Sequence, residues 1–574
     1  MVCVVFIIVI GVYCIVLINY ILSVNYIIRI IYFYFGTDMD NTEISPKQKY
    51  ENKICDSKMT FEECELAILR HAVDETDKIK KEDISNSEDV KKMIEIVENF
   101  LRQKKCVCYG GTAINNILPK HAQFYNRDIE IPDYDFYSSN ALSDAKELAD
   151  IFFAAGYTDV EAKSGVHHGT YKVFVNFIPM ADLTEIHASL FKSLSKDAVV
   201  IQGIHYAPPE FLRMNMFIEL SRPKGDVSRW EKVLKRLNLL NEYYPLKTPE
   251  SCSTVDFQRK MDSHTSDSDK IYFIVRDTFI EQEVIFFGGY ASSLYSKYMP
   301  PAQKRQIQQI PDFDVLSEDM EQCAAVVKQR LETIGKMTNV QIIRHPELGE
   351  VIPKHIEIRV DREIIAFIYE PIACHNYNII LLEPEDNLKK SVEANRVQSE
   401  MRLHSKEIRV ATIDTMLSFY LAFLYADAPY YYKDRILCMA KFLFDVEQQN
   451  RLNQNGLLKR FSIDCYGKQP TLETIRAEKS EMYKKLKSQK NSTEYERWFL
   501  RYNPSEKPSL KNSGKNSNRV GTLKTGNKMN GVSKSVRPRR RSNSSSRKTT
   551  KTDLYKLFRK KTQRNRRKKD LWII

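Results

Sequence analysis

One pattern occurs twice in the chain and limits the folds open to it. A short apolar strand ends in a glycine pair, a helix follows, and a later strand carries two aspartates one residue apart. The second glycine precedes the first aspartate by 22 residues in one copy and 23 in the other, and the second aspartate precedes a helix-ending glycine by 21 in both. Two copies of one αβ unit explain these spacings. The repeated positions are Gly111, Asp133, Asp135 and Gly156 in copy one, and Gly289, Asp312, Asp314 and Gly335 in copy two.

The residues around the repeats predict a mixed α/β (α+β) fold, duplicated, with helical segments outside it. Apolar residues at helical spacing predict helices over 58–103 and 210–245, and apolar helices over 405–450 complete the second copy. Segments such as TYKVFVNFIPMADLTEI predict strands. The expected parts are an N-terminal helical region (39–90), a catalytic domain (91–250), a second domain (270–450) and a helical extension (451–502).

The first 38 residues form an apolar extension, in which Arg29 is the only charge before residue 37. The apolar run is long enough to span a bilayer, so it is interpreted as a transmembrane anchor or an uncleaved signal. A second interpretation is an over-extended start, because an ordinary polar N-terminus begins at Met39. Both interpretations stay open.

Charge is divided unevenly along the chain. Residues 503–574 hold 23 Lys and Arg against 3 acidic residues, and the remainder holds 64 basic and 71 acidic residues. The last segment lacks core-forming residues and is predicted to be a disordered basic tail. It is interpreted either as a solvated tail or as an electrostatic tether for RNA.

The 11 cysteines are scattered, and their spacing matches neither a disulfide framework nor a zinc site. We therefore expect no disulfides, and a reducing compartment.

Asp133 and Asp135 are the leading candidates for catalysis. Side chains two residues apart on a strand share a face, so their carboxylates are expected close together. Neighbouring carboxylates repel unless a cation joins them, and hard oxygen ligands suit Mg²⁺ or Mn²⁺. Asp182, on a later strand, is placed to supply the third ligand of a site for two ions. The expected chemistry is attack of a 3′-hydroxyl on an α-phosphate, with pyrophosphate leaving.

Residues near the first glycine pair are candidates for binding a triphosphate. Gly110 and Gly111 allow the backbone to approach phosphate, and the helix that starts near Thr112 directs N–H groups toward it. Lys172 is a candidate phosphate contact, although an exposed strand lysine is the simpler interpretation. His167 and His168 in SGVHHGTYKV lack a partner at ligand spacing and are interpreted as loop or wall residues, with contact to substrate as the other option.

Several segments together resemble the catalytic subunit of the poly(A) polymerases of large cytoplasmic DNA viruses, the mimivirus type above all. They are YGGTAINNILP, IPDYDFYS, SGVHHGTYKVFVNFIPMADLT and LSRPKGDVSRWEKVLKRL, and the resemblance covers roughly residues 60–450. It implies a DNA polymerase β-like nucleotidyltransferase fold, ATP as substrate and an RNA 3′ end as primer. It implies that Asp133, Asp135 and Asp182 bind the metal ions.

The resemblance also bears on partners and location. It implies a homodimer, or a separate processivity or cap-methylating subunit as in the poxvirus relatives. It implies a cytoplasmic location in the viral factory, and also presence in the virion.

Copy two departs from the pattern. Aligning Val175-Asn176 with Val360-Asp361 places Phe367 opposite Asp182, and a phenyl ring cannot bind a metal ion. We expect Asp312 and Asp314 to be a decayed site. Two other functions remain open for the chain: nucleotidyl transfer with a different nucleotide or acceptor, and an inactive RNA-binding scaffold.

Overall fold

The computed structural model describes residues 54–55, 59–85, 87–126, 131–247, 249–253, 268–304, 312–349, 351–382, 406–428 and 430–506. The predictions for the N-terminal extension, and for the basic tail from residue 507 onward, lie outside these residues. Residues 503–506, predicted as the start of the disordered tail, are instead ordered and end in a short 3-10 helix (Pro504–Glu506). No helix in the described ranges is long and apolar enough to cross a membrane. All the described residues belong to one compact unit, which holds every element described below.

The first sheet has eight strands and contains the first copy of the repeat. Its strands, in spatial order, are β16 (Arg501–Tyr502), β3 (Val160–Ser164), β4 (Thr170–Val175), β5 (Ile178–Glu185), β2 (Tyr134–Ser138), β1 (Val107–Tyr109), β7 (Ile204–Tyr206) and β6 (Val199–Ile201).

The second sheet also has eight strands and contains the second copy. Its strands, in spatial order, are β10 (Val340–His345), β11 (His355–Val360), β12 (Glu363–Tyr369), β9 (Phe313–Leu316), β8 (Ile285–Phe287), β14 (Lys406–Ala411), β13 (His375–Leu382) and β15 (Cys465–Tyr466).

The two sheets share one topology. The glycine-pair strand runs antiparallel to the aspartate strand in both, and the aspartate strand runs parallel to β5 or to β12. The pairing of β4 with β5 and of β11 with β12 also carries a register shift at the same place. The duplicated α/β fold is therefore confirmed.

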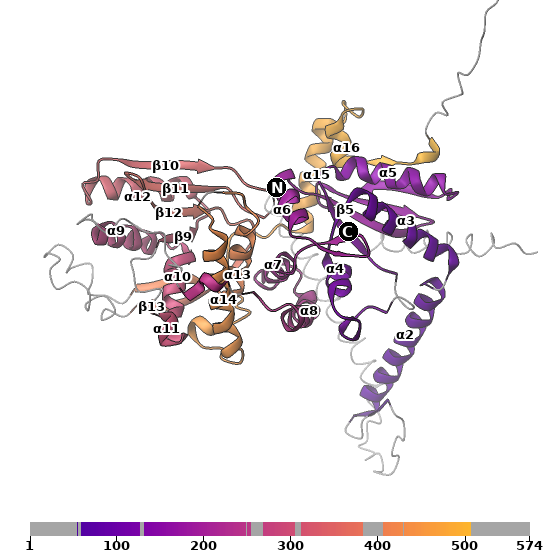
Figure 1. Ribbon diagram of the computed structural model, residues 1–574, viewed down its shortest axis with the longest axis horizontal. Helices are drawn as coiled ribbons and strands as arrows, with labels where there is room; N and C mark the ends of the chain where they lie inside the picture. The colour runs from indigo at the N-terminus through magenta and orange to yellow at the C-terminus, as the bar shows by residue number, and fades with distance from the viewer. Residues whose placement is uncertain are drawn as a thin grey trace, which may run out of the picture. The chain divides into compact units, whose positions relative to one another are not determined.

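Helices pack beside both sheets. The main ones are α2 (Phe61–Ser85), α3 (Glu88–Lys104), α4 (Gly110–Ile117), α5 (Ala141–Ala154), α6 (Ala188–Lys196), α7 (Pro209–Leu220), α8 (Trp230–Tyr243), α9 (Ser268–Glu281), α10 (Gly288–Tyr295), α12 (Met320–Thr333), α13 (Ile413–Phe423), α14 (Lys433–Gln449), α15 (Leu472–Leu486) and α16 (Thr493–Phe499). In the first sheet, α3 and α5 lie alongside the strands (Figure 1).

The face of the first sheet covered by α3 and α5 is a hydrophobic core. Phe136 on β2 is fully buried, and its ring centroid lies 6.2 Å from that of Phe100 on α3. Side chains alternate along a strand, so the residues on either side of Phe136 point to the opposite face. That opposite face carries the candidate site.

Two expectations about the elements need correction. Lys406–Ala411, expected to be helical, form β14, because they pair with β13 and continue the second sheet. The extension 451–502, expected to be helical, also contributes β15 and β16, which add to the edges of the two sheets.

The expectation that the cysteines form no disulfides was wrong. Cys55–Cys64, Cys252–Cys438 and Cys374–Cys465 are bonded pairs. Two of these pairs are 186 and 91 residues apart in sequence, so only the folded chain brings them together. The inference of a reducing compartment, which rested on that expectation, loses its basis.

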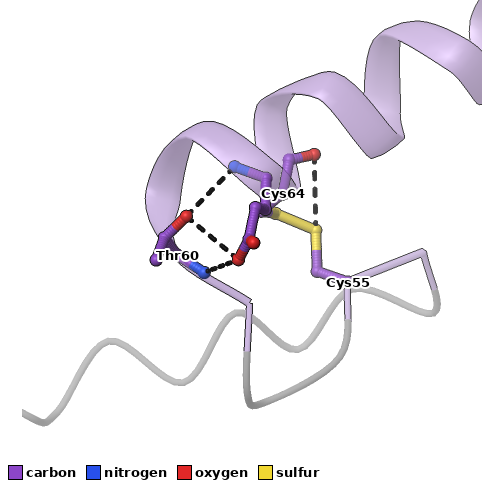
Figure 2. Close-up of a disulfide and its surroundings, with 4 residues drawn as sticks. Cys55, Thr60 and Cys64 are labelled. Atoms are coloured by element: carbon purple, nitrogen blue, oxygen red, sulfur yellow. Dashed lines mark hydrogen bonds between the residues drawn. A yellow bond between two sulfur atoms is a disulfide. The ribbon is translucent and has the colours of Figure 1, made fainter.

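The Cys55–Cys64 disulfide ties the chain ahead of α2 to the first turn of that helix (Figure 2). The same turn is capped from both sides: the Thr60 N–H donates to a Glu63 carboxylate oxygen (2.8 Å), and the Glu63 N–H donates to the Thr60 hydroxyl (3.3 Å). Reciprocal bonds of this kind satisfy N–H groups that have no partner within the helix.

Candidate active site

Two of the three predicted carboxylates meet on neighbouring strands. Asp135 on β2 pairs in register with Asp182 on the parallel strand β5. In-register residues on adjacent strands point to the same face, with backbones about 4.8 Å apart. The fold therefore brings together two aspartates that are 47 positions apart in the sequence.

Asp133 reaches the site in a different way from the one predicted. It was expected to share a strand with Asp135, but β2 begins at Tyr134 and Asp133 is exposed just before it. Its carbonyl oxygen accepts hydrogen bonds from the Asp135 N–H (3.2 Å) and from the Thr112 hydroxyl (2.7 Å). These bonds use Asp133 to close a local turn, so strand alternation does not set its side-chain direction.

The electrostatics show that the carboxylates act on one another. Burial raises the pKa of Asp135 to about 7, and the charges of Asp133 and Asp182 add to the rise. Burial also raises the pKa of Asp182, against the effect of a hydrogen bond from Lys172. Carboxylates that resist ionisation carry more negative charge, when ionised, than the positive charge around them offsets.

Lys172 supplies a positive charge in this site by contacting one of the carboxylates. Its ammonium group donates to a carboxylate oxygen of Asp182, its register partner across β4 and β5. Lys172 was a candidate phosphate contact, with an exposed strand lysine as the simpler interpretation, and in the structure it pairs with a carboxylate on a half-exposed strand position.

The donor chemistry of the site fits a hard cation. Asp133, Asp135 and Asp182 offer carboxylate oxygens, the ligands that Mg²⁺ and Mn²⁺ prefer. The raised pKa values of Asp135 and Asp182 show that their charge is under-compensated. Among the described residues, however, no group of three or more His, Cys, Asp or Glu side chains is already arranged around a cation position. Asp182 would have to leave Lys172 to serve as a ligand.

The glycine pair lies against the carboxylates. Gly110 has a φ of +74°, and a Cβ there would lie 2.7 Å from a carboxylate oxygen of Asp135. A Cβ at Gly111 would lie 2.6 Å from the Tyr125 hydroxyl. A Cβ at either position would therefore force a neighbouring side chain to move, and Gly110 also needs glycine for its backbone conformation. The predicted triphosphate-binding segment and the carboxylates share one site.

Sequence reasoning missed several residues that complete the wall of this site. The Tyr109 ring stacks on Tyr137 (centroids 3.9 Å apart), and its hydroxyl hydrogen-bonds that of Thr184 (2.9 Å). Arg236 donates to the Tyr125 hydroxyl (2.5 Å) beside Gly111. Tyr109 directly precedes the glycine pair and Arg236 lies in RWEKVLKRL, so both stand in motifs that the sequence had singled out.

The histidine pair belongs to the loop between β3 and β4. His167 and His168 are exposed, and the His168 ring lies 4.3 Å from the Trp498 ring of α16. The exposed loop position fits the interpretation of the pair as loop residues, and His168 contacts the C-terminal extension.

Copy two carries the predicted substitution at the third position. Asp314 on β9 pairs in register with Phe367 on β12, which confirms that an aromatic residue faces the second aspartate. Phe367 pairs in turn with Glu357, so the position of Lys172 is taken by a carboxylate. Glu357 is fully buried and receives hydrogen bonds from His345 (2.7 Å) and Arg359.

A family model described as poly(A) polymerase catalytic subunit matches residues 95–226. Two viral proteins described as poly(A) polymerase catalytic subunits are similar to this chain. The African swine fever virus protein (isolate Pig/Kenya/KEN-50/1950) is 29% identical over 178 residues, which are 30% of this chain and 37% of that protein. The Acanthamoeba polyphaga mimivirus protein is 30% identical over 175 residues, which are 30% of this chain and 28% of that protein. The matched part thus spans about a third of these relatives' length.

The likeness in fold extends further along the chain. The crystal structure of the Megavirus polyadenylate synthase superposes with a TM-score of 0.62 and 19% sequence identity. The superposition covers 79% of this chain and 88% of that one. Over residues 95–226 the chain therefore resembles the catalytic subunits of viral poly(A) polymerases in sequence, and over most of its length it resembles a viral polyadenylate synthase in fold.

Proposed function

We propose that the chain is a template-independent poly(A) polymerase, which transfers AMP from ATP to the 3′ end of RNA. The observation that carries the proposal is the in-register pair of Asp135 and Asp182 beside Gly110 and Gly111. The family match over 95–226 spans all four residues.

The chain's own residues divide the work. Asp133, Asp135 and Asp182 would hold two Mg²⁺ or Mn²⁺ ions. Such ions, when bound, favour ionisation of an attacking hydroxyl and offset the charge on a leaving pyrophosphate. Gly110, Gly111 and the start of α4 would accept the triphosphate through backbone N–H groups. Tyr109 and Tyr137 form an aromatic wall beside the aspartates.

Partners and location follow the same proposal. RNA would gain affinity from the basic tail, because polyanion binding grows with the number of neutralised phosphates. A homodimer, a processivity or cap-methylating subunit, and a place in the cytoplasmic viral factory and virion remain proposals. Truncation after Lys507 should lower RNA affinity and flatten its salt dependence, and an unchanged salt dependence would refute the tether.

Primer extension tests the activity. The full chain is incubated with an end-labelled RNA, Mg²⁺ or Mn²⁺, and each NTP in turn, and products are resolved by length. We expect extension with ATP, and none above background for Asp133→Ala/Asp135→Ala.

Other outcomes of this experiment select the rival functions. Extension with a nucleotide other than ATP would replace the poly(A) assignment with another nucleotidyl transfer. RNA binding without transfer of any nucleotide would indicate an inactive scaffold.

A further inference from the structure

A row of aligned side chains crosses the first sheet from the carboxylates to its edge. Asp182 on β5 pairs with Lys172 on β4, Lys172 pairs with Lys163 on β3, and Lys163 pairs with Arg501 on β16. Register partners on adjacent strands point to one face. The three cations therefore stand side by side on the face that carries Asp135 and Asp182.

This side of the sheet is open to solvent. The Lys172 and Lys163 side chains are 36% and 41% exposed, and Arg501 is exposed. The alternate residues of β4, including Tyr171 and Val173, are fully buried on the opposite face. The row is therefore a surface feature and not part of the core.

An aromatic ring lies within the row. Phe174 is two residues from Lys172 on β4, shares its face and is half-buried. The Lys163 ammonium lies 4.0 Å from the centroid of the Phe174 ring. Proteins that bind single-stranded nucleic acid combine cations with aromatic rings, so that the phosphates contact the cations and the bases stack on the rings.

Nearby carboxylates neutralise only part of the positive charge of Lys172, Lys163 and Arg501. Lys172 pairs with Asp182, and Lys163 pairs with Glu161 at 3.2 Å, an exposed contact of small energy. No described residue forms a hydrogen bond or ion pair with the Arg501 side chain. The outer end of the row can therefore neutralise an external anion.

The C-terminal extension holds Arg501 in place. The Ser164 N–H donates to the Leu500 carbonyl (3.1 Å), the Tyr502 hydroxyl donates to Asp150 (2.6 Å), and Lys146 pairs with Glu496 (2.7 Å). These contacts fix the residues around Arg501 against β3 and α5. The extension thus completes a surface of the first sheet from about 340 residues downstream in the sequence.

The order of the strands decides which polyanion fits the row. Gly110 and the start of α4 adjoin β1, on one side of Asp135, whereas β4, β3 and β16 lie beyond Asp182 on the other side. A triphosphate at the glycine pair leaves the row free for a second polyanion. We propose that Lys172, Lys163 and Arg501 bind the phosphate backbone of the RNA primer, which leads its 3′ end to Asp182. This inference rests on the proposed function.

The salt dependence of RNA binding tests the proposed phosphate contacts of the row without a catalytic step. Binding of a short fluorescent RNA by the full chain is followed by anisotropy, without nucleotide, over a range of salt concentrations. Each lost phosphate contact should lower the slope of log K against log salt by about 0.7 for single strands. Lys163→Gln/Arg501→Gln should therefore lower the slope by about 1.4. In primer extension the same variant should raise the KM for primer and leave the KM for ATP as it is.

Two further variants keep the test specific. Lys163→Arg/Arg501→Lys keeps the charges and should keep the slope. Lys91→Gln/Lys92→Gln removes two exposed cations from α3, which covers the opposite face of the sheet, and should leave RNA binding unchanged. Thermal melting confirms that every variant is folded.

Three results are distinguishable. An unchanged slope and primer KM in Lys163→Gln/Arg501→Gln would overturn the inference. A raised KM for ATP with unchanged RNA affinity would also overturn it, and would assign the row to the triphosphate. Failure of the wild type to extend any primer would refute the proposed function. The salt dependence of RNA binding needs no catalysis, so it would still show whether Lys163 and Arg501 contact phosphate.

Discussion

The two sheets share one strand order but differ in a second row of register partners, which crosses each sheet from the glycine-pair strand through the second aspartate. In copy one the row reads Tyr109, Asp135, Asp182, Lys172 across β1, β2, β5 and β4. In copy two the matching row reads Phe287, Asp314, Phe367, Glu357 across β8, β9, β12 and β11. Strand topology therefore fixes where such a row lies, and the residue at each position decides whether it can act as a site.

In copy two the row is buried except at Asp314, which is half-buried. Phe367 is 1% exposed, and its ring lies among His345, His355 and Tyr430, with centroids 5.0–6.3 Å away. Burial lowers the pKa of His355 to about 4, so this imidazole is neutral near pH 7. Packing of this kind stabilises a fold, and a phenyl ring at this position supplies no ligand for a metal ion.

The largest difference between the copies should appear in activity. Asp133→Ala/Asp135→Ala is expected to lower primer extension by at least about 10³-fold, because it removes the groups that favour the transition state. Asp312→Ala/Asp314→Ala, the matched change in copy two, is expected to alter it less than about threefold. Initial rates at saturating ATP and primer measure both.

Thermal melting of each double variant separates loss of a catalytic group from loss of fold. A folded Asp312→Ala/Asp314→Ala protein without activity would break the comparison, because copy two would then contribute to catalysis.

Sequence reasoning reached the duplication, the order of the elements from each glycine pair to the strand of the third position, and Phe367, because each depends on spacing and alternation along the chain. It did not predict the short strands β6 and β7 or the strand β13. It placed Asp133 on the strand, because the hydrogen bond from the Thr112 hydroxyl to the Asp133 carbonyl joins segments 21 residues apart. It missed Arg501 as a neighbour of Lys163, since that pairing joins strands more than 330 residues apart. Disulfides such as Cys252–Cys438 were missed for the same reason.

Substitutions at the third position of the row should affect activity in copy one, at Asp182, and stability in copy two, at Phe367. Phe367→Ala is expected to lower the free energy of unfolding by about 3–5 kcal/mol, the usual cost of a cavity left by a buried ring. Asp182→Ala should change stability far less, because the carboxylate that it removes is partly exposed and its ionised form is disfavoured by burial. The same substitution should abolish primer extension. Urea unfolding and primer extension of both variants measure the two effects. Equal losses of stability would show that Asp182 is as structural as Phe367.

The raised pKa of Asp135 should make stability depend on pH. Between its usual pKa of 3.8 and about 7, the folded chain holds a proton that the unfolded chain releases, so stability falls as pH rises through this window. Asp135→Asn should remove this fall and stabilise the metal-free protein by roughly 2–4 kcal/mol at pH 8, with little effect near pH 4. Denaturant unfolding in EDTA at both pH values measures it.

Added Mg²⁺ gives the complementary result. It should raise the melting temperature of the wild type more at pH 8 than at pH 5.5, because a carboxylate must lose its proton to bind a cation. Asp135→Asn should respond less. A wild type whose stability is the same from pH 4 to pH 8 in EDTA would contradict the raised pKa.

The glycine pairs should show the smallest difference in stability between the copies. Gly110 and Gly288 have φ angles of +74° and +73°, and in both a Cβ would contact the second aspartate of its own copy. Gly110→Ala and Gly288→Ala are each expected to cost about 1–3 kcal/mol, measured by urea unfolding.

Activity separates the two glycine variants. Gly110→Ala should also lower primer extension, because its Cβ displaces the Asp135 carboxylate, whereas Gly288→Ala should retain the rate of the wild type. Gly156→Ala supplies the control, since a Cβ there meets nothing within 4 Å and adds backbone strain alone. If Gly110→Ala kept full activity while losing stability, the glycine pair would be a packing feature common to both sheets, and the triphosphate would have to bind elsewhere.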